Sequence, residues 1–277
     1  METATRELLS YTQHYLGPHR EWLVFIHGAG GSSITWKRQV NSFKRFFNLL
    51  LVDMRDHGES KNLQPAYSAY DFDIVTGDVI DLIDHLGIKK AHFLSLSLGS
   101  IVLQRLEDRR PDLVQSMIMA GGVFKADWKI HLFAHSGKFL SYFIPFRYIY
   151  DLFALVVLPR ENHRSSRRLY RLTSKKLTAT EFLKWLGLYR DLFKTIRRFY
   201  RKELRKSSLI VMGGQDHVFL DAARRFAGNQ AQNAQLVILE GCGHICNLEK
   251  AQLFNETVLK FLGVDPQDQG ETGATAS

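Results

Sequence analysis

The chain has 277 residues, enough for one large domain with a substantial buried core. Apolar residues make up 45% of the sequence and charged residues 23%, a balance that is typical of a globular protein and argues against general disorder. The only two cysteines, Cys242 and Cys246, come late in the chain, so they do not indicate a disulfide-rich domain. No second Cys/His pair at suitable spacing accompanies them, and we therefore expect no metal site.

The net charge of +9 is concentrated in one segment. Residues 124–206 contain 20 Lys and Arg against 6 Asp and Glu, a balance of +14, whereas the remainder carries 17 and 22, a balance of −5. Such a segment is either a solvated helix surface or a binding surface for an anionic partner, such as acidic lipid headgroups or an anionic substrate. It belongs to no recognisable nucleic-acid-binding module, so we expect no nucleic-acid partner. The basic residues concerned include Arg164, Arg167, Arg168, Arg171, Lys175, Lys176, Arg197, Arg198, Arg201 and Lys202.

The two ends of the chain carry little structural signal. Residues 1–7 lack the basic start and apolar core of a secretory signal, so we expect a cytoplasmic protein, with peripheral membrane contact through the basic segment as an alternative. The composition of residues 264–277 predicts a disordered tail. Residues 139–158 have the length of a membrane span, but Pro145 and two charges near the middle argue against one.

Short apolar runs alternate with amphipathic stretches through the first half of the chain. Apolar residues recur at three- and four-residue steps within 71–86, which indicates a helix, and Gly87 is suited to end it. Strands and helices that alternate in this way form a parallel sheet covered on both faces. The expected strands are 22–26, 47–52, 91–94 and 114–120, with a further helix from Gly99 to Arg109.

The second half begins with a helical segment. Strand signals stop at about Phe124, and Thr178 with Glu181 forms a T-x-x-E capping box that begins one of several expected helices. Strands are expected again at 208–212 and 235–239, and helices at 219–227 and 248–262. The apolar residues after the capping box share one helix face: Phe182, Trp185, Leu186, Tyr189, Phe193 and Ile196.

Between the strand at 91–94 and the following helix lies Ser95-x-Ser97-x-Gly99. Small residues two positions to either side of Ser97 permit a very tight strand-to-helix turn, which exposes the central hydroxyl at a helix N-terminus where negative charge is favoured. The pattern resembles the nucleophile elbow of the α/β-hydrolase superfamily, usually G-x-S-x-G. Here Ser95 replaces the first Gly.

A Gly-rich loop directly follows the strand at 22–26. Such a loop lets backbone N–H groups approach a ligand, and it lacks both the Gly-Lys-Ser/Thr ending and the G-x-G-x-x-G pattern of nucleotide-binding loops. We expect no cofactor. In the hydrolase family a His-Gly-x loop at this place supplies half of the oxyanion hole, so the resemblance implies the backbone N–H groups of Ala29 and Leu98 as donors. Substrate-pocket or loop residues expected on the same basis are His27, Gly28 and Gly30.

Three residues that follow strands have the order of the family's catalytic triad. A serine hydroxyl needs a base to take its proton, and a histidine held by a carboxylate supplies one near neutral pH. Ser97, Asp216 and His244 follow the strands at 91–94, 208–212 and 235–239, so all three are expected at the C-terminal edge of the sheet.

Residues 53–60 resemble another family segment, D-x-R-G-x-G-x-S, with Asp56 where Gly is commoner. Its charged side chains are expected to stabilise the loop, with Asp53 and Arg55 forming hydrogen bonds rather than acting in catalysis.

The resemblance covers residues 20–262 and implies an α/β-hydrolase fold: a mostly parallel central sheet flanked by helices, with a helical cap insertion. The expected division is a core at 1–123 and 207–263, a cap or lid at 124–206, and the tail at 264–277. Haloalkane dehalogenases and epoxide hydrolases of this superfamily have Asp at the position of Ser97, so neither activity is expected.

The expected activity is hydrolysis of a carboxylic ester with an apolar acyl or lipid-like part, because an aromatic-rich cap favours an apolar pocket. Thioester, C–C and peptide bonds are alternatives on the same triad. A slow-turnover ligand-binding or signalling protein of this fold is an alternative from another class, since a fold does not determine function. The sequence does not indicate an oligomeric state.

Overall fold

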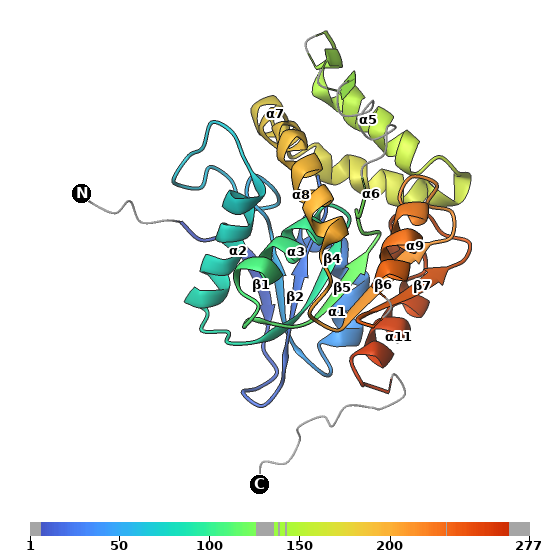
Figure 1. The fold of residues 1–277 in the computed structure, drawn as a ribbon. Coiled ribbons are helices and arrows are strands. Elements are labelled where there is room, and N and C mark those ends of the chain that lie inside the picture. Colours follow the sequence, from blue (N-terminus) through green and yellow to red (C-terminus); the bar gives the residue numbers. More distant parts are fainter. Residues whose placement is uncertain (1–6, 126–135, 138, 142, 231, 266–277) are drawn as a thin grey trace, which may run out of the picture.

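The computed structural model describes residues 7–125, 136–137, 139–141, 143–230 and 232–265 (Figure 1). Its centre is a seven-stranded sheet in the order β1-β3-β2-β4-β5-β6-β7. Only β1, at one edge, is antiparallel to its neighbour within this sheet. The strands are β1 Tyr11–His14, β2 Trp22–Ile26, β3 Asn48–Val52, β4 Ala91–Leu96, β5 Val114–Ala120, β6 Ser208–Gly213 and β7 Ala234–Leu239.

Helices cover both faces of this sheet (Figure 1). On one face α2 packs against α3, and on the other α1 packs against α11. The parallel strands are therefore buried on both sides, as their continuous apolar runs predict. The helices of this part are η1 Ser33–Trp36 (3₁₀), α1 Lys37–Phe43, α2 Phe72–His85, α3 Gly99–Arg109, α9 Leu220–Asn229, α10 Cys246–Glu249 and α11 Ala251–Phe261.

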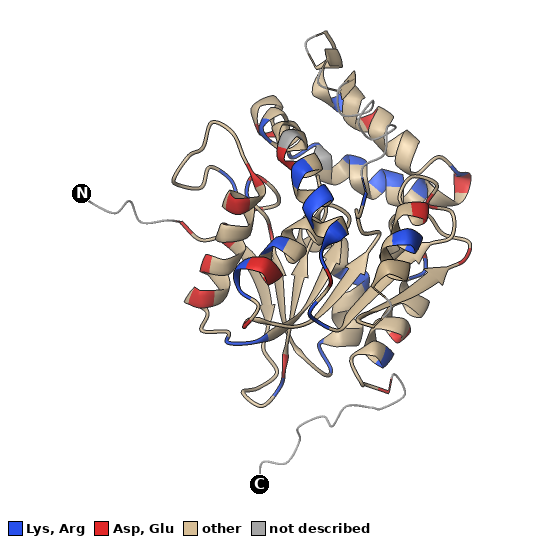
Figure 2. Ribbon diagram, viewed as in Figure 1, with Lys and Arg blue, Asp and Glu red and all other residues tan. Residues whose placement is uncertain are grey.

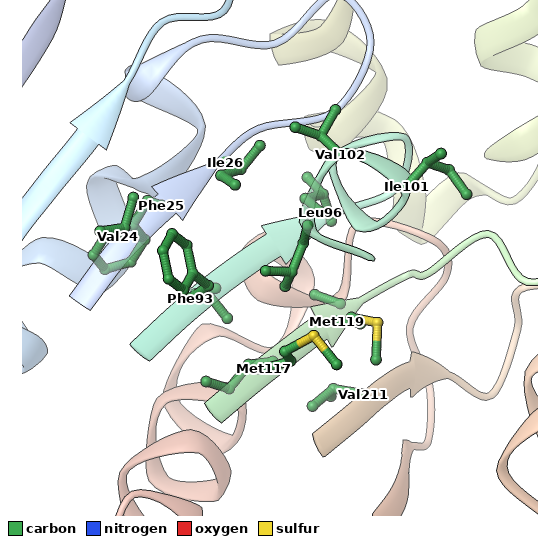
Figure 3. Close-up of a cluster of buried hydrophobic side chains, with 14 of the residues drawn as sticks. Val24, Phe25, Ile26, Phe93, Leu96, Ile101, Val102, Met117, Met119 and Val211 are labelled. Carbon is green, nitrogen blue, oxygen red and sulfur yellow. The ribbon is translucent and has the colours of Figure 1, made fainter. Parts of the chain in front are cut away.

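Strands β2, β4, β5 and β6 form the middle of the hydrophobic core. Figure 3 shows Phe93 of β4 between the side chains of β2 and the two methionines of β5, Met117 and Met119. All of these side chains are fully buried, and Ile101 and Val102 close the core from α3. This packing fixes the positions of the strand ends. The loops that carry the site residues begin at these ends.

A helical insertion, residues 124–206, separates β5 from β6 and lies beyond the C-terminal ends of the strands (Figure 1). Twelve of its residues, 126–135, 138 and 142, fall outside the described part. Within the described residues, none of the helices combines the length and the apolar character needed to span a bilayer. The described helices of the insertion are α5 Phe146–Val157, η2 Glu161–His163 (3₁₀), α6 Arg164–Ser174, α7 Ala179–Gly187 and α8 Tyr189–Arg201.

The elements expected from the sequence are confirmed, with four differences. The helix after the capping box is two helices, α7 and α8, which meet at Leu188, so the shared apolar face is divided between them. The capping box itself is present, since Thr178 and Glu181 hydrogen-bond each other's backbone N–H groups at 3.2 and 2.7 Å. The last helix is likewise interrupted at Lys250. Strand β1 and helix α1 were not predicted, because β1 is a short exposed edge strand and α1 spans only two turns.

Candidate active site

Ser97 lies in the turn between β4 and α3 with a φ of 52°, a conformation that residues with a side chain rarely adopt. The turn is tight because α3 begins directly against the end of β2. A Cβ atom at Gly99 would lie 2.6 Å from the carbonyl oxygens of Ile26 and His27, so only glycine fits there. The backbone therefore has the tight turn expected of a nucleophile elbow, with a half-buried serine at its centre.

Ser95, which departs from the family pattern, fits this turn without disturbing it. The residue is fully buried at the end of β4, and its hydroxyl donates a hydrogen bond to the carbonyl oxygen of Ile118 on β5 at 3.1 Å. The buried hydroxyl thus has a hydrogen-bond partner within the sheet.

The structure brings Ser97, His244 and Asp216 together from three loops. His244 Nε2 lies 2.9 Å from Ser97 Oγ, and His244 Nδ1 lies 2.7 Å from Asp216 Oδ2. Donation of the Nδ1 proton to the carboxylate leaves the Nε2 lone pair free to accept the serine proton. The geometry matches a nucleophile, its base and the group that orients the base.

The Asp216 carboxylate is held ionised in a fully buried position. Burial acts to raise its pKa, but the charge and hydrogen bond of His244 and the amides of Phe219 and Val218 together lower the pKa below its usual value. Those amides donate to Oδ1 at 3.0 and 3.2 Å. Each carboxylate oxygen therefore has a partner, and Oδ2 remains directed at His244.

Two backbone N–H groups beside Ser97 make no hydrogen bond to any described residue: those of Ala29 and Leu98. Both residues line the same cavity as Ser97 and His244. The neighbouring donors in the Gly-rich loop are occupied, since Gly31 donates to the carbonyl of Gly28 and Gly30 donates to Nε2 of His57, at 3.0 and 2.9 Å. The amides of Ala29 and Leu98, which the resemblance implied as oxyanion donors, are therefore available to a ligand in the cavity.

His27 belongs to the Gly-rich loop, but it lines no part of the cavity. Its ring is fully buried, with Nδ1 donating to the carbonyl of Gly28 at 2.7 Å and Nε2 accepting from the amide of Met54 at 2.9 Å. Burial lowers its pKa, which keeps the ring neutral in this arrangement. Of the three expected pocket or loop residues, two line cavities: Gly28 lines the cavity beside Ser97, and Gly30 lines a second cavity.

Sequence reasoning did not assign a role to His57. Its Nδ1 donates to the carbonyl of Arg55 at 3.0 Å, which leaves Nε2 to accept the Gly30 amide, and its ring packs edge-on against Trp185 of α7. The hydroxyl of Tyr150, on α5, lies over Gly30, where a Cβ atom would overlap it. His57 and Tyr150 thus fix the loop that presents the Ala29 amide.

Asp53 and Arg55 stabilise loops, as the sequence predicts. Asp53 accepts from the amides of Ser33 and Glu59 at 2.6 and 3.0 Å. Arg55 forms a two-pronged ion pair with Asp78, both distances being 2.8 Å, and donates to the carbonyl oxygens of two loop residues. Asp56 has a φ of 65°, which explains why glycine is commoner at its position in the family.

A cavity of about 200 Å³ extends from Ser97 and His244 into the helical insertion. Its wall is almost entirely apolar, and no Lys, Arg, Asp or Glu of the described chain lines it. Ser166 on α6 is a polar exception: it is 1% exposed, and its hydroxyl has no hydrogen-bond partner among the described residues. A second cavity of about 140 Å³, which Ala29 and Leu98 also line, lies against α5 and α7.

The insertion also contacts the loops that carry Asp216 and His244. Nε2 of His163 donates to the side-chain oxygen of Gln215 at 2.9 Å, and Asn162 donates to the same oxygen. The His163 ring is fully buried beside Gly243, where a Cβ atom would lie 2.7 Å from it. No sequence signal pointed to His163, because only the packing of the insertion brings it to this place.

Cys242 and Cys246 are both buried beside the site, and burial raises the pKa of each thiol. Their sulfur atoms approach backbone carbonyls of the sheet region, and both ring nitrogens of the nearby His244 are engaged by Asp216 and Ser97. The described residues contain no group of three or more His, Cys, Asp or Glu arranged to hold a metal ion.

A model of the alpha/beta hydrolase family matches residues 23–257, most of the chain. The chain therefore belongs to this family and is a hydrolase of the α/β-hydrolase kind, and the fold expected from the sequence is confirmed.

Some curated relatives match along nearly their whole length. The chain is 22% identical over 269 residues to the uncharacterized hydrolase YugF of Bacillus subtilis, covering 91% of this chain and 93% of the relative. It is 24% identical over 275 residues to a 2-hydroxy-6-oxononadienedioate/2-hydroxy-6-oxononatrienedioate hydrolase of Burkholderia vietnamiensis, covering 90% of each.

Solved structures share the fold at low identity. The enol-lactonase from Burkholderia xenovorans has a TM-score of 0.75 at 22% identity, covering 92% of this chain and 96% of that one. A bromoperoxidase from Bacillus anthracis has a TM-score of 0.77 at 18% identity, covering 91% and 94%. Relatives so diverse in activity leave the substrate to be argued from the site itself.

Proposed function

We propose that this hydrolase cleaves an uncharged carboxylic ester with an apolar acyl part, through an acyl-enzyme on Ser97. The observation that carries the proposal is the hydrogen-bonded series Ser97–His244–Asp216 opening on an apolar cavity with two free backbone donors. Each component has a defined chemical use in acyl transfer.

The reaction has two halves. Ser97 Oγ attacks the ester carbonyl carbon while His244 Nε2 takes the hydroxyl proton, and the carbonyl oxygen becomes an anion that accepts hydrogen bonds from the Ala29 and Leu98 amides. His244 then gives the proton to the departing alcohol oxygen, which leaves the acyl group on Ser97. A water molecule attacks the acyl carbon with His244 again as the base, and the acid is released. Asp216 keeps the proton on Nδ1 throughout.

The lining of the cavity supports an uncharged substrate. A carboxylate buried there would have no cation to pair with among the described lining residues, and burial of an unpaired charge is costly. The dioate substrates in the name of the Burkholderia vietnamiensis relative carry such charges, so the proposal departs from that relative. The buried hydroxyl of Ser166 would gain a partner from a carbonyl or hydroxyl group on the acyl part.

The helical insertion acts as the cap in this proposal, with the core at 1–123 and 207–263. Helices α5 and α6 supply much of the cavity wall, including Phe153, Val157 and Leu169, so they select the acyl part. The cap also shields the acyl-enzyme from bulk water, which strengthens the hydrogen bonds of the oxyanion donors.

The test is hydrolysis of p-nitrophenyl esters over a series of acyl lengths. Because each buried CH₂ contributes about 0.8 kcal/mol, kcat/KM is expected to rise roughly fourfold per added CH₂ until the cavity is filled. The succinate monoester should be a poor substrate beside the butyrate ester of similar length. Ser97→Ala should abolish turnover. Wild-type protein that is folded but inactive on every ester would refute ester hydrolysis and favour another bond or a binding role.

A further inference from the structure

Helix α5 presents apolar side chains on both of its faces. On the inner face Ile149, Tyr150, Ala154 and Val157 are buried. The last two line the cavity at Ser97, and the first two line the second cavity. The opposite face, which we call the α5 outer face, carries Tyr148, Leu152, Leu155 and Val156, which are 66%, 45%, 47% and 39% exposed. A helix on the surface of a globular protein normally exposes polar residues there.

Exposed apolar side chains gather in this part of the molecule. Thirteen large apolar side chains of the described residues are exposed, and eight belong to the helical insertion. Besides the α5 outer face they include Phe139 and Phe143, which contact each other at a ring-centroid distance of 5.1 Å, with Leu172 on α6 and Leu183 on α7. An exposed apolar helix face such as the α5 outer face marks a surface that binds a partner or a membrane.

Basic side chains accompany the apolar ones. Arg168 of α6 and Lys175, directly after its end, are exposed four residues before and three residues after Leu172, and neither forms an ion pair with an acidic side chain of the described residues. Helix α6 packs against α5, and Arg171 pairs with Asp151 at 2.8 Å. Figure 2 shows blue segments along α6 and α8, whereas α5 is mostly tan. The whole insertion carries a balance of +14.

The position of α5 makes this surface accessible. In Figure 1 it lies at the outer edge of the insertion, beyond α6 and on the far side of the molecule from α11. A broad surface can therefore contact the α5 outer face without meeting the central sheet.

We propose that the α5 outer face binds the surface of a membrane containing anionic lipids. Its apolar side chains enter the boundary between headgroups and acyl chains, while the cations of α6 interact with acidic headgroups. A membrane accounts for both features at once, because a purely apolar partner would leave the cations without a counter-charge. Since the inner face of α5 lines the cavity, the bound orientation places the cavity near the lipid. The binding itself does not depend on the ester hydrolysis proposed above.

Vesicle flotation tests the apolar contribution. We compare phosphatidylcholine vesicles with vesicles that also contain about 30% phosphatidylglycerol, using the full chain. Wild-type protein should bind the anionic vesicles and bind the neutral ones about tenfold or more weakly. The double variant Leu152→Asp, Leu155→Asp should bind at least about tenfold more weakly than the wild type. Leu253→Asp is the matched control, because Leu253 on α11 is equally exposed, at 47%, but lies away from the insertion.

A second set of variants tests the contribution of the basic side chains to vesicle binding. Arg168→Glu with Lys175→Glu should weaken binding to anionic vesicles about tenfold, whereas Lys260→Glu on α11 should not change it. Equal binding of the wild type to both vesicle types, no binding to either, or normal binding by the leucine double variant would overturn the proposal. So would a wild-type dimer, detected by size-exclusion chromatography, that the leucine double variant converts to a monomer, because a second copy would then cover this face.

Discussion

His163 of the helical insertion and Gln215 of the core hydrogen-bond at 2.9 Å, and Gln215 is directly followed by Asp216. The same imidazole packs against Gly243, which directly precedes His244. One buried side chain of the insertion therefore contacts both loops that deliver the acid and the base. We interpret His163 as a positioning residue for the Asp216–His244 pair.

His163→Ala should consequently lower kcat by about ten- to a hundredfold with little change in KM, because small misplacement of a catalytic group is costly. Asn162→Ala is the matched control: Asn162 is exposed and donates to the same oxygen of Gln215, and its loss should cost less than about threefold. Steady-state kinetics on one ester compares the two. Equal losses in both variants, or a change in KM alone, would show that His163 does not position the pair.

Ser95→Gly restores the usual family pattern and should not improve the enzyme. Because the Ser95 hydroxyl forms its hydrogen bond to Ile118 within the sheet, kcat/KM of the variant should remain within about threefold of the wild type. The free energy of unfolding should fall by about 1 kcal/mol, because a hydrogen bond is lost and glycine disfavours a strand. Urea unfolding and ester kinetics measure the two effects. A tenfold gain in rate would mean that Ser95 distorts the turn after all.

Gly30→Ala should damage the oxyanion loop. The residue has a φ of 67°, and an added Cβ would overlap the Tyr150 hydroxyl, so either the loop or α5 must move. We expect kcat to fall by about a hundredfold, which is the cost of misaligning one oxyanion donor. Gly187→Ala serves as the control, because nothing lies within 4 Å of a Cβ there and its φ is not positive. Unchanged kcat in Gly30→Ala would remove the Ala29 amide from the mechanism.

Stability should depend on pH through the two buried imidazoles beside the site. Burial lowers the pKa of His27 and of His57 below the ordinary 6.5, so the folded protein keeps both rings neutral where the unfolded chain protonates them. The unfolded state then binds more protons, and the free energy of unfolding should fall below pH 6.5 by up to about 1.4 kcal/mol per pH unit for each ring.

Urea denaturation at pH 7.0 and 5.5 measures this dependence. His57→Gln removes one of the two rings, so it should reduce the difference in the free energy of unfolding between the two pH values by the contribution of that ring. The Asp216 carboxylate has a lowered pKa and affects stability at a more acidic pH. Its contribution to the free energy of unfolding is present above the ordinary pKa of an aspartate and is lost as the pH falls through the lowered pKa. A wild-type free energy of unfolding that is the same at both pH values would contradict the assignment of neutral buried rings.

The sequence predicts the core of this fold well because the relevant signals are local. Continuous apolar runs identify β2 to β7, and residues that follow parallel strands must meet at one edge, which is why Ser97, Asp216 and His244 could be predicted together. The proposed oxyanion donors, the amides of Ala29 and Leu98, follow instead from the resemblance to the hydrolase family, whose His-Gly-x loop supplies one of them.

The remaining features of the site depend on packing between distant segments. Nothing in the local sequence distinguishes His163 or Tyr150 from other residues of the insertion, yet one contacts the triad loops and the other lies over Gly30. His27 resembled a pocket residue because it adjoins the Gly-rich loop, but its ring turns inward to join Gly28 and Met54. The division between α7 and α8 likewise reflects how the insertion folds over the sheet rather than its periodicity.

The most direct measurement is mass spectrometry of the protein after reaction with a fluorophosphonate, a reagent that phosphonylates activated serines. The account predicts a single adduct on the peptide that contains Ser97, complete loss of ester hydrolysis in the labelled protein, and no adduct in Ser97→Ala. His244→Gln, which leaves the serine without its base, should react at least about a thousandfold more slowly. An unlabelled wild-type protein, or an adduct on another residue with Ser97 unmodified, would contradict the claim that Ser97 is the nucleophile.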